Sequence, residues 1–140
     1  MMVTLRDYDY KAPFVYMGGK RTVADLVWAR LGDVPNYCEP FAGSLAVLLK
    51  RPSPPQTETV NDLDCFLANA WRSMSRYPEE TAEYACWPVS EVDMQARHHY
   101  LVMGPESERF RESMRTDPDF CSPKFAGWWL YARLVGSDLP

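Results

Sequence analysis

The chain has 140 residues, of which 46% are hydrophobic and 14% aromatic, so it is long enough to bury a core as one domain. Its formal net charge of −4 argues against a free-standing DNA-binding module, because such modules usually present a basic face. Neither a signal peptide nor a long apolar run occurs, and we therefore expect a soluble, cytoplasmic protein.

Predicted helices and strands alternate in the first half of the chain. After an arm over the first dozen residues, apolar spacing predicts a helix over residues 22–31, which Gly32 ends. Its buried face is expected to contain Val23, Leu26, Val27 and Leu31. A strand over residues 36–41 and a helix over residues 44–50 follow.

A proline-rich turn over residues 51–55 comes next, and neither a helix nor a central strand could accommodate it. Beyond it the pattern predicts a second strand over residues 57–61 and a helix over residues 65–75. This strand-helix-strand-helix order predicts an α/β fold with a parallel sheet of the nucleotide-binding kind.

The first strand runs into its helix through a tight glycine turn. The turn has the sequence Glu39-Pro40-Phe41-Ala42-Gly43-Ser44. Because glycine has no Cβ, the backbone at Gly43 can approach a ligand closely, and the amides that begin the next helix would point at that ligand. The turn therefore indicates a pocket for a nucleotide cofactor.

Another glycine turn lies earlier in the chain, just before the first predicted helix. Its sequence is Tyr16-Met17-Gly18-Gly19-Lys20. The glycine pair permits a positive φ, and Lys20 places a cation beside it, so the block could hold the carboxylate of an amino-acid-like ligand or a phosphate. The alternative is an ordinary turn that opens the helix.

Two polar residues, Asn61 and Asp62, end the second strand. An acidic side chain at this place, about 20 residues after a glycine turn, is well placed to accept hydrogen bonds from ribose hydroxyls. The alternative role for Asp62 is to cap the helix that begins near residue 64. Both roles could hold, with Asp62 on the ribose and Asp64 as the cap.

In this order, the three blocks resemble the amino-terminal half of the Dam-like adenine-specific DNA methyltransferases. The resemblance implies a partial Rossmann-like methyltransferase sheet that binds S-adenosylmethionine. Lys20 and the Gly18-Gly19 turn would lie near the methionine end of the cofactor, Phe41 to Ser44 under its centre, and Asp62 on its ribose. The implied cofactor-binding residues are Tyr16, Met17, Gly18, Gly19, Lys20, Glu39, Pro40, Phe41, Ala42, Gly43, Ser44, Asn61 and Asp62.

One position departs from the family pattern, since Leu45 stands where a second glycine is common. A leucine adopts a positive φ only at a cost. Leu45, Leu48 and Leu49 also have helical spacing. We therefore expect Leu45 to be helical already and to lie on a buried face with the other two leucines; the alternative is that the cofactor sits slightly differently.

The second half of the chain is predicted to be a helical insert. We therefore expect a cofactor-binding portion over residues 1–77 and a helical portion over residues 78–140. Helix starts are predicted at Pro78, at Ser90 with an acidic capping box, at Pro105 and at Pro123. The predicted helices end near residues 103, 115 and 135, the last before Gly136. The resemblance suggests that this insert recognises target DNA; the alternative is a helical cap that completes the core.

Two surfaces of the insert have alternative interpretations. Arg109, Arg111 and Arg115 could form a basic patch for DNA, but the exposed face of an amphipathic helix is the favoured interpretation. The last helix carries an apolar stripe, which we expect to be core rather than a base-stacking or partner surface. The stripe consists of Phe125, Trp128, Trp129, Ala132 and Val135.

No metal site is expected. The four cysteines have no zinc-like spacing, and we interpret them as reduced core thiols. They are Cys38, Cys65, Cys86 and Cys121. The adjacent residues His98 and His99 point about 100° apart on a helix and do not readily share a metal ion.

The resembled family holds the target adenine with an Asp-Pro-Pro-Tyr-type motif, and no such string occurs here. The nearest string, residues 117–120, reads Asp-Pro-Asp-Phe and is expected to be a loop between helices. We therefore assign no catalytic residue. The chain is expected to be a truncated or split enzyme, inactive alone, whose partners are duplex DNA with a flipped adenine and a carboxy-terminal half or second chain. The alternative is a non-catalytic interaction protein derived from a methyltransferase.

Overall fold

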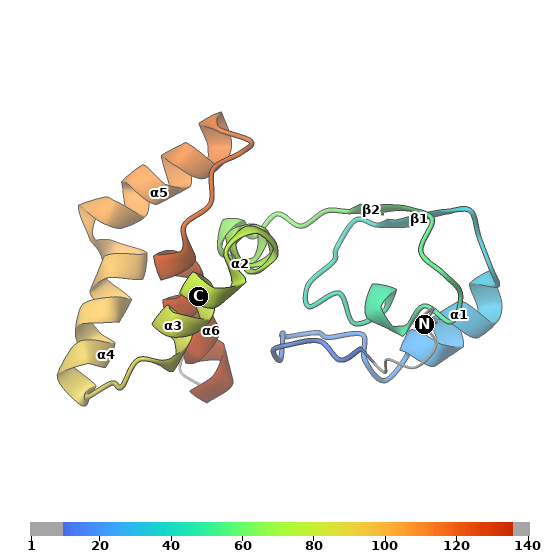
Figure 1. Ribbon diagram of the computed structural model, residues 1–140, viewed down its shortest axis with the longest axis horizontal. Helices are drawn as coiled ribbons and strands as arrows, with labels where there is room; N and C mark the ends of the chain where they lie inside the picture. The colour runs from blue at the N-terminus through green and yellow to red at the C-terminus, as the bar shows by residue number, and fades with distance from the viewer. Residues whose placement is uncertain (1–9, 136–140) are drawn as a thin grey trace. The chain divides into compact units, whose positions relative to one another are not determined.

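The computed structural model describes residues 10–135 and divides the chain into two compact units, residues 1–63 and 64–140. Figure 1 shows their elements. The division falls after Leu63, whereas the boundary predicted from the sequence follows Tyr77. Helix α2 (Cys65–Arg76) belongs to the second unit because it packs against α6 (Pro123–Val135). Most of the predicted amino-terminal arm and the predicted helix stop at Gly136 lie outside the described residues.

The first unit contains helix α1 (Ala24–Leu31), strand β1 (Asn36–Glu39), a short 3-10 turn (Leu48–Lys50) and strand β2 (Thr57–Val60). The two strands pair in parallel, and Asn36 lies opposite Thr57. This confirms the predicted mixed α/β character and the parallel pairing. The Rossmann-like order of a larger sheet stays a prediction, since residues 10–135 contain two strands.

The core of the first unit forms around Trp28. The rings of Trp28 and Tyr37 have centroids 4.8 Å apart, and the indole N–H of Trp28 donates to the carbonyl of Val47 at 2.7 Å. Ala24, one helical turn before Trp28, is fully buried. This arrangement ties α1 to strand β1 and to the segment that follows the glycine turn.

The predicted buried face of α1 is therefore wrong. Val23, Leu26 and Leu31 are 42%, 56% and 47% exposed, and only Val27 packs against the Trp28 cluster. A tryptophan buries more apolar area than a leucine, and its indole N–H needs an acceptor inside the protein. The helix therefore turns toward Ala24 and Trp28 rather than toward its aliphatic residues.

Arg51 closes the proline-rich turn. Its guanidinium lies over the Trp28 ring at 5.3 Å, pairs with Glu58 at 3.1 Å and donates to the carbonyl of Val34 at 2.6 Å. The turn itself has neither helix nor strand, as predicted. Arg51 therefore joins the start of the turn to β2 and to the segment just before β1.

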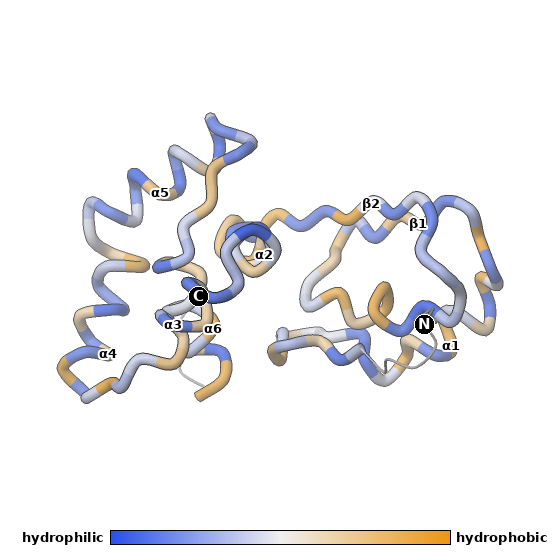
Figure 2. Tube along the Cα trace, viewed as in Figure 1, coloured by the Kyte–Doolittle hydropathy of each residue, from blue (hydrophilic) through white to orange (hydrophobic). Residues whose placement is uncertain are grey.

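The second unit is helical, as predicted. It contains α2, α3 (Pro78–Cys86), α4 (Glu91–His98), a π-helical segment (His99–Met103), α5 (Pro105–Thr116) and α6. Helix α5 is largely hydrophilic along its length (Figure 2). The predicted helix over 91–103 exists, with its last turn widened to a π-helix.

The predicted capping box at the start of α4 is confirmed. The Asp93 amide donates to Ser90 Oγ at 3.3 Å, and the Ser90 amide donates to the Asp93 carboxylate at 2.9 Å. The hydrogen bond from the Ser90 side chain to this carboxylate lowers the pKa of Asp93. The box satisfies amides that the first turn of a helix leaves without partners.

Helix α6 is the core of the second unit and packs against α2 and α3. The prediction that its apolar stripe is mainly core holds for Phe125, Trp129 and Ala132, which are buried, whereas Val135 is 52% exposed. Phe125 stacks on Phe110 of α5 with centroids 4.2 Å apart. The stripe thus holds three helices together.

One buried amide connects α2 to the start of α6. Asn69 is fully buried; its side chain donates to the carbonyl of Ser122 at 3.0 Å and accepts from the Ser122 amide at 2.7 Å. Both polar groups of the side chain are therefore satisfied inside the core.

The cysteines differ in part from the prediction. All four are free, as expected, but Cys38 and Cys86 are exposed and Cys65 and Cys121 are only partly buried, so the interpretation as core thiols is wrong. Among residues 10–135 no group of acidic, histidine or cysteine side chains could hold a metal ion. No helix in that range is long and apolar enough to span a membrane.

Helices α3 and α6 approach each other closely at Gly127. A Cβ at this position would lie 2.5 Å from the Tyr84 Cβ and 2.7 Å from the Thr81 carbonyl oxygen. We expect Gly127→Ala to lower the free energy of unfolding by about 1–3 kcal/mol, although alanine is the better helix former. Urea denaturation measures the change, and Glu83→Ala on the exposed face of α3 is the control. Equal stability of the two variants would show that the helices separate without cost.

Candidate functional site

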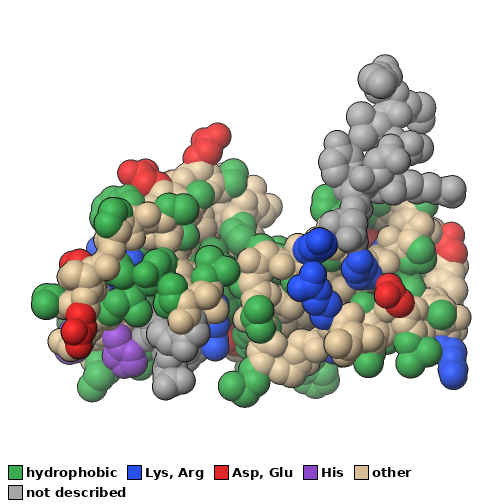
Figure 3. All heavy atoms as spheres, turned by 90° about the horizontal axis from the view of Figure 1, so that it is seen from below, with side chains coloured by type: hydrophobic (Ala, Val, Ile, Leu, Met, Phe, Trp, Pro, Cys, Tyr) green, Lys and Arg blue, Asp and Glu red, His purple; other side chains and the backbone are tan. Residues whose placement is uncertain are grey.

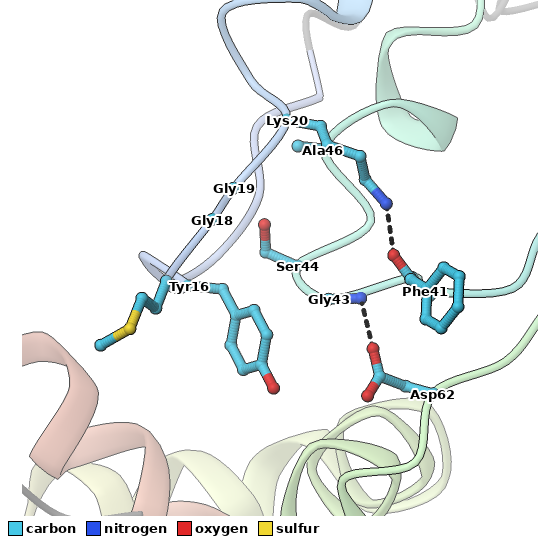
Figure 4. Close-up of a pocket in the computed structure, with 11 residues that line it drawn as sticks. Tyr16, Gly18, Gly19, Lys20, Phe41, Gly43, Ser44, Ala46 and Asp62 are labelled. Carbon is cyan, nitrogen blue, oxygen red and sulfur yellow. Dashed lines mark hydrogen bonds between the residues drawn. The ribbon is translucent and has the colours of Figure 1, made fainter.

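A cavity of about 330 Å³ lies within the first unit, and its walls come from three separate segments (Figure 4). Ligand pockets in proteins commonly begin at this volume. The lining residues are Tyr16, Met17, Gly18, Gly19, Lys20, Phe41, Ala42, Gly43, Ser44, Ala46 and Asp62. The fold therefore brings together the two glycine turns and the acidic residue that sequence analysis singled out.

Three predicted site residues, Glu39, Pro40 and Asn61, do not line this cavity. Glu39 is only 4% exposed, because its position on β1 directs it into the unit. Asn61 uses its side-chain amide to donate to the carbonyl of Pro40 at 3.2 Å, which ties the ends of the two strands. Ala46 lines the cavity but is not among the predicted site residues, because the sequence places it in a helix whereas it lies in a loop.

The first glycine turn owes its shape to its two glycines. Gly18 has φ 72°, which favours glycine. The Gly19 amide donates to the Tyr16 carbonyl at 2.9 Å, and a Cβ at Gly19 would lie 2.9 Å from that oxygen. The turn therefore closes tightly and brings Lys20 back toward the end of β1.

Lys20 joins the first glycine turn to the second. Its ammonium group lies 2.6 Å from the carboxylate of Glu39 and donates to the carbonyl of Phe41. The other oxygen of Glu39 accepts from the Tyr37 hydroxyl at 3.0 Å. Burial, reinforced by the Glu39 carboxylate, raises the pKa of Tyr37, so the phenol remains a hydrogen-bond donor.

Asp62 holds the second glycine turn from the opposite side. The Gly43 amide donates to its carboxylate at 2.9 Å (Figure 4). The cap of α2 is instead Asp64, which accepts from the amides of Phe66 at 2.9 Å and Leu67 at 3.3 Å. The alternative role of Asp62 as the helix cap is therefore wrong, and Asp64 has that role.

The segment after the second glycine turn is a loop, and the predicted helix over residues 44–50 is wrong apart from its last three residues. Leu45 has φ 56°, so the expectation that it avoids a positive φ is wrong too. Ala46 and Val47 are the buried residues, and Leu45, Leu48 and Leu49 are only partly buried. The Val47 carbonyl accepts from the Trp28 indole as well as from the Lys50 amide, so this residue ties the segment to α1.

The string Asp117 to Phe120 forms the loop between α5 and α6, as predicted. The Asp119 carboxylate pairs with Arg76 at 3.3 Å and is 88% exposed. The loop belongs to the second unit. Its position agrees with a structural role.

The three arginines of α5 are exposed. Arg115 pairs with Glu112, and Arg111 lies over the Phe66 ring at 5.3 Å. These contacts agree with the exposed face of an amphipathic helix. On the face of the second unit drawn in Figure 3, hydrophobic side chains cover more area than basic ones do.

The model of the family described as D12 class N6 adenine-specific DNA methyltransferase matches residues 16–108. The match includes all three segments of the cavity and extends into α5. No curated protein and no solved structure matches the chain.

The backbone at Leu45 provides a test of the loop that forms the cavity. Leu45→Gly and Leu45→Ala remove nearly the same packing, but only glycine adopts φ 56° without strain. We expect the glycine variant to be more stable than the alanine variant by about 1 kcal/mol. Thermal unfolding measures the difference. At the neighbouring residue, Ala46→Gly should lower stability by about 0.5–1 kcal/mol or more, and the same sign at both positions would contradict the loop conformation.

Proposed function

The chain belongs to the D12 class N6 adenine-specific DNA methyltransferase family, and from this premise we propose that its cavity binds S-adenosylmethionine for methyl transfer to the amino group of adenine in DNA. The observation that carries the proposal is the convergence of both glycine turns and Asp62 on one cavity. These three segments are distant in sequence and would have no reason to line the same space in an unrelated fold.

The shape of the cavity suits a nucleoside with an extended chain. Gly18 faces open space, since nothing lies within 4 Å of the position of its Cβ, and a Cβ at Gly43 would lie 3.1 Å from the Tyr16 ring. Side chains at these two positions would narrow the cavity. The glycines therefore keep room for a ligand beside the backbone.

Asp62 is the proposed partner of the ribose. The Gly43 amide donates to its carboxylate, and a carboxylate only accepts hydrogen bonds, through two oxygens with about four lone-pair sites. The bond also fixes the direction of the carboxylate before a ligand arrives. Preorganisation of this kind lowers the entropy lost on binding.

Lys20, Gly18 and Gly19 are proposed to surround the methionine end of the cofactor, and Phe41 to Ser44 its centre. The Phe41 side chain is 80% exposed at the edge of the cavity, where an aromatic ring can cover an adenine ring. When bound, S-adenosylmethionine supplies a methyl group on a positively charged sulfur. The residues of this chain bind and orient it.

The residues that would receive the target adenine are proposed to come from further polypeptide, either a carboxy-terminal half or a second chain. The open side of β2 supports this proposal. Thr57, Thr59 and Val60 are exposed, whereas parallel strands are usually covered on both faces. An added strand would pair with the other backbone edge of β2, and helices that come with it would cover these side chains.

A second candidate is a non-catalytic interaction protein that retains the methyltransferase fold. Large apolar side chains support this alternative, because Val15, Met17 and Leu63 are 80%, 89% and 98% exposed in the first unit. Exposed apolar side chains of this size are available for contact with a partner. Light scattering separates the candidates: an interaction protein of this kind should associate at micromolar concentration without any cofactor.

The proposal predicts different effects at two neighbouring aspartates. Asp62→Ala should weaken binding of S-adenosylmethionine by about 1–3 kcal/mol. Asp64→Ala should leave the dissociation constant unchanged and lower the free energy of unfolding by about 1 kcal/mol, because it removes only a helix cap. Calorimetry and urea denaturation measure the two quantities. Absence of cofactor binding to the wild-type chain, or equal weakening by both changes, would contradict the assignment.

Methyl transfer to duplex DNA tests the proposed division of labour. We expect the chain alone to bind the cofactor without turnover, because no Asp-Pro-Pro-Tyr-type string is present. Addition of a polypeptide that carries this motif, taken from the reading frame next to this one, should produce labelled N6-methyladenine. Turnover by the chain alone would show that its own residues hold the adenine.

A further inference from the structure

We infer that Glu39 determines the class of ligand that the cavity accepts, by neutralising Lys20 so that the site favours a zwitterionic amino-acid end over a phosphate end. This inference rests on the proposed function. Its basis is the pair in which the Lys20 ammonium lies 2.6 Å from a Glu39 carboxylate whose side chain is only 5% exposed.

The two partners face different surroundings. Lys20 lines the cavity and its side chain is 35% exposed. Glu39 does not line the cavity; it lies behind Lys20, and the Tyr37 hydroxyl holds its second oxygen. Glu39 therefore acts on a ligand through Lys20 and through its field rather than by contact.

The pair removes most of the net charge from this end of the cavity. An isolated lysine beside a glycine turn attracts a phosphate, which carries up to two negative charges. A lysine paired with a buried carboxylate presents an oriented dipole with no net charge. A phosphate group entering here would gain the attraction of Lys20 and lose a similar amount to repulsion from Glu39.

A zwitterion fits this dipole. The methionine end of S-adenosylmethionine carries one carboxylate and one ammonium group, so its net charge is zero. An ammonium group has three N–H donors; Lys20 donates one of them to the Phe41 carbonyl and forms an ion pair with Glu39. Another N–H of Lys20 can donate to the ligand carboxylate, while the ligand ammonium gains from the field of Glu39.

The experiment compares three adenosine ligands that differ only beyond the ribose. S-adenosylhomocysteine ends in a zwitterion, 5′-methylthioadenosine ends in a methyl group, and ADP ends in phosphates. Calorimetry at low ionic strength without magnesium measures their dissociation constants for the full chain. The wild type should bind S-adenosylhomocysteine at least about tenfold more tightly than 5′-methylthioadenosine, and ADP no more tightly than 5′-methylthioadenosine.

Glu39→Gln should raise the affinity of the cavity for a ligand that ends in phosphate. The change keeps the shape of the side chain and leaves Lys20 with an uncompensated charge, so the affinity for ADP relative to 5′-methylthioadenosine should rise about tenfold. Glu58→Gln is the matched control, because Glu58 pairs with Arg51 in the same unit and loses the same charge away from the cavity. It should leave all three affinities unchanged within about twofold.

If circular dichroism shows that Glu39→Gln does not fold, a second variant tests the same proposal. Lys20→Gln should lower the affinity for S-adenosylhomocysteine to about that for 5′-methylthioadenosine. An unchanged preference among the three ligands in Glu39→Gln, an equal change in Glu58→Gln, or an unchanged preference in Lys20→Gln would each overturn the role of Glu39. Failure of the wild type to bind S-adenosylhomocysteine would overturn the proposed function itself.

Discussion

The ammonium group of Lys20 lies between the buried carboxylate of Glu39 and the carbonyl of Phe41, and the arrangement of the cavity depends on this contact. It fixes the first glycine turn to the end of β1, although the two segments are far apart in sequence. On the other side, Asp62 at the end of β2 binds the Gly43 amide. Because β1 and β2 are parallel neighbours, their ends supply both contacts at one edge of the sheet, where ligands bind in open α/β folds.

The segment after the glycine turn shows why these contacts dominate. Residues 44–47 have helix-forming character by sequence, yet they form a loop whose Val47 carbonyl accepts from the Trp28 indole as well as from the Lys50 amide. Leu45 takes a positive φ at a local cost of about 1–2 kcal/mol. Burial of the Trp28 cluster is worth more than this cost, because a buried aromatic side chain alone contributes about 2–3 kcal/mol. The loop thus gains its shape from the core rather than from local preference.

In the second unit, by contrast, each helix begins at residues that favour a helix start locally. Pro78 and Pro105 occupy first turns, Ser90 and Asp93 form a capping box, and Asp64 caps α2. The helices then assemble on α6, where Gly127 permits close approach of α3. Some of the exposed arginines of α5 already contact neighbouring side chains of the second unit. The reason to associate this protein with DNA is its family, not its surface charge.

Sequence by itself determined the existence of both strands, the helices of the second half, the three blocks that line the cavity and the family. These features depend on contacts within a few residues, such as caps, prolines and glycine turns, or on motifs that can be read directly. Only the tertiary structure decided which face of α1 is buried, that residues 44–47 form a loop, that Glu39 lies behind Lys20, and that Asp62 and Asp64 have separate roles. Each of these depends on one side chain meeting a partner about 20 positions away, and neither periodicity nor propensity contains such pairings.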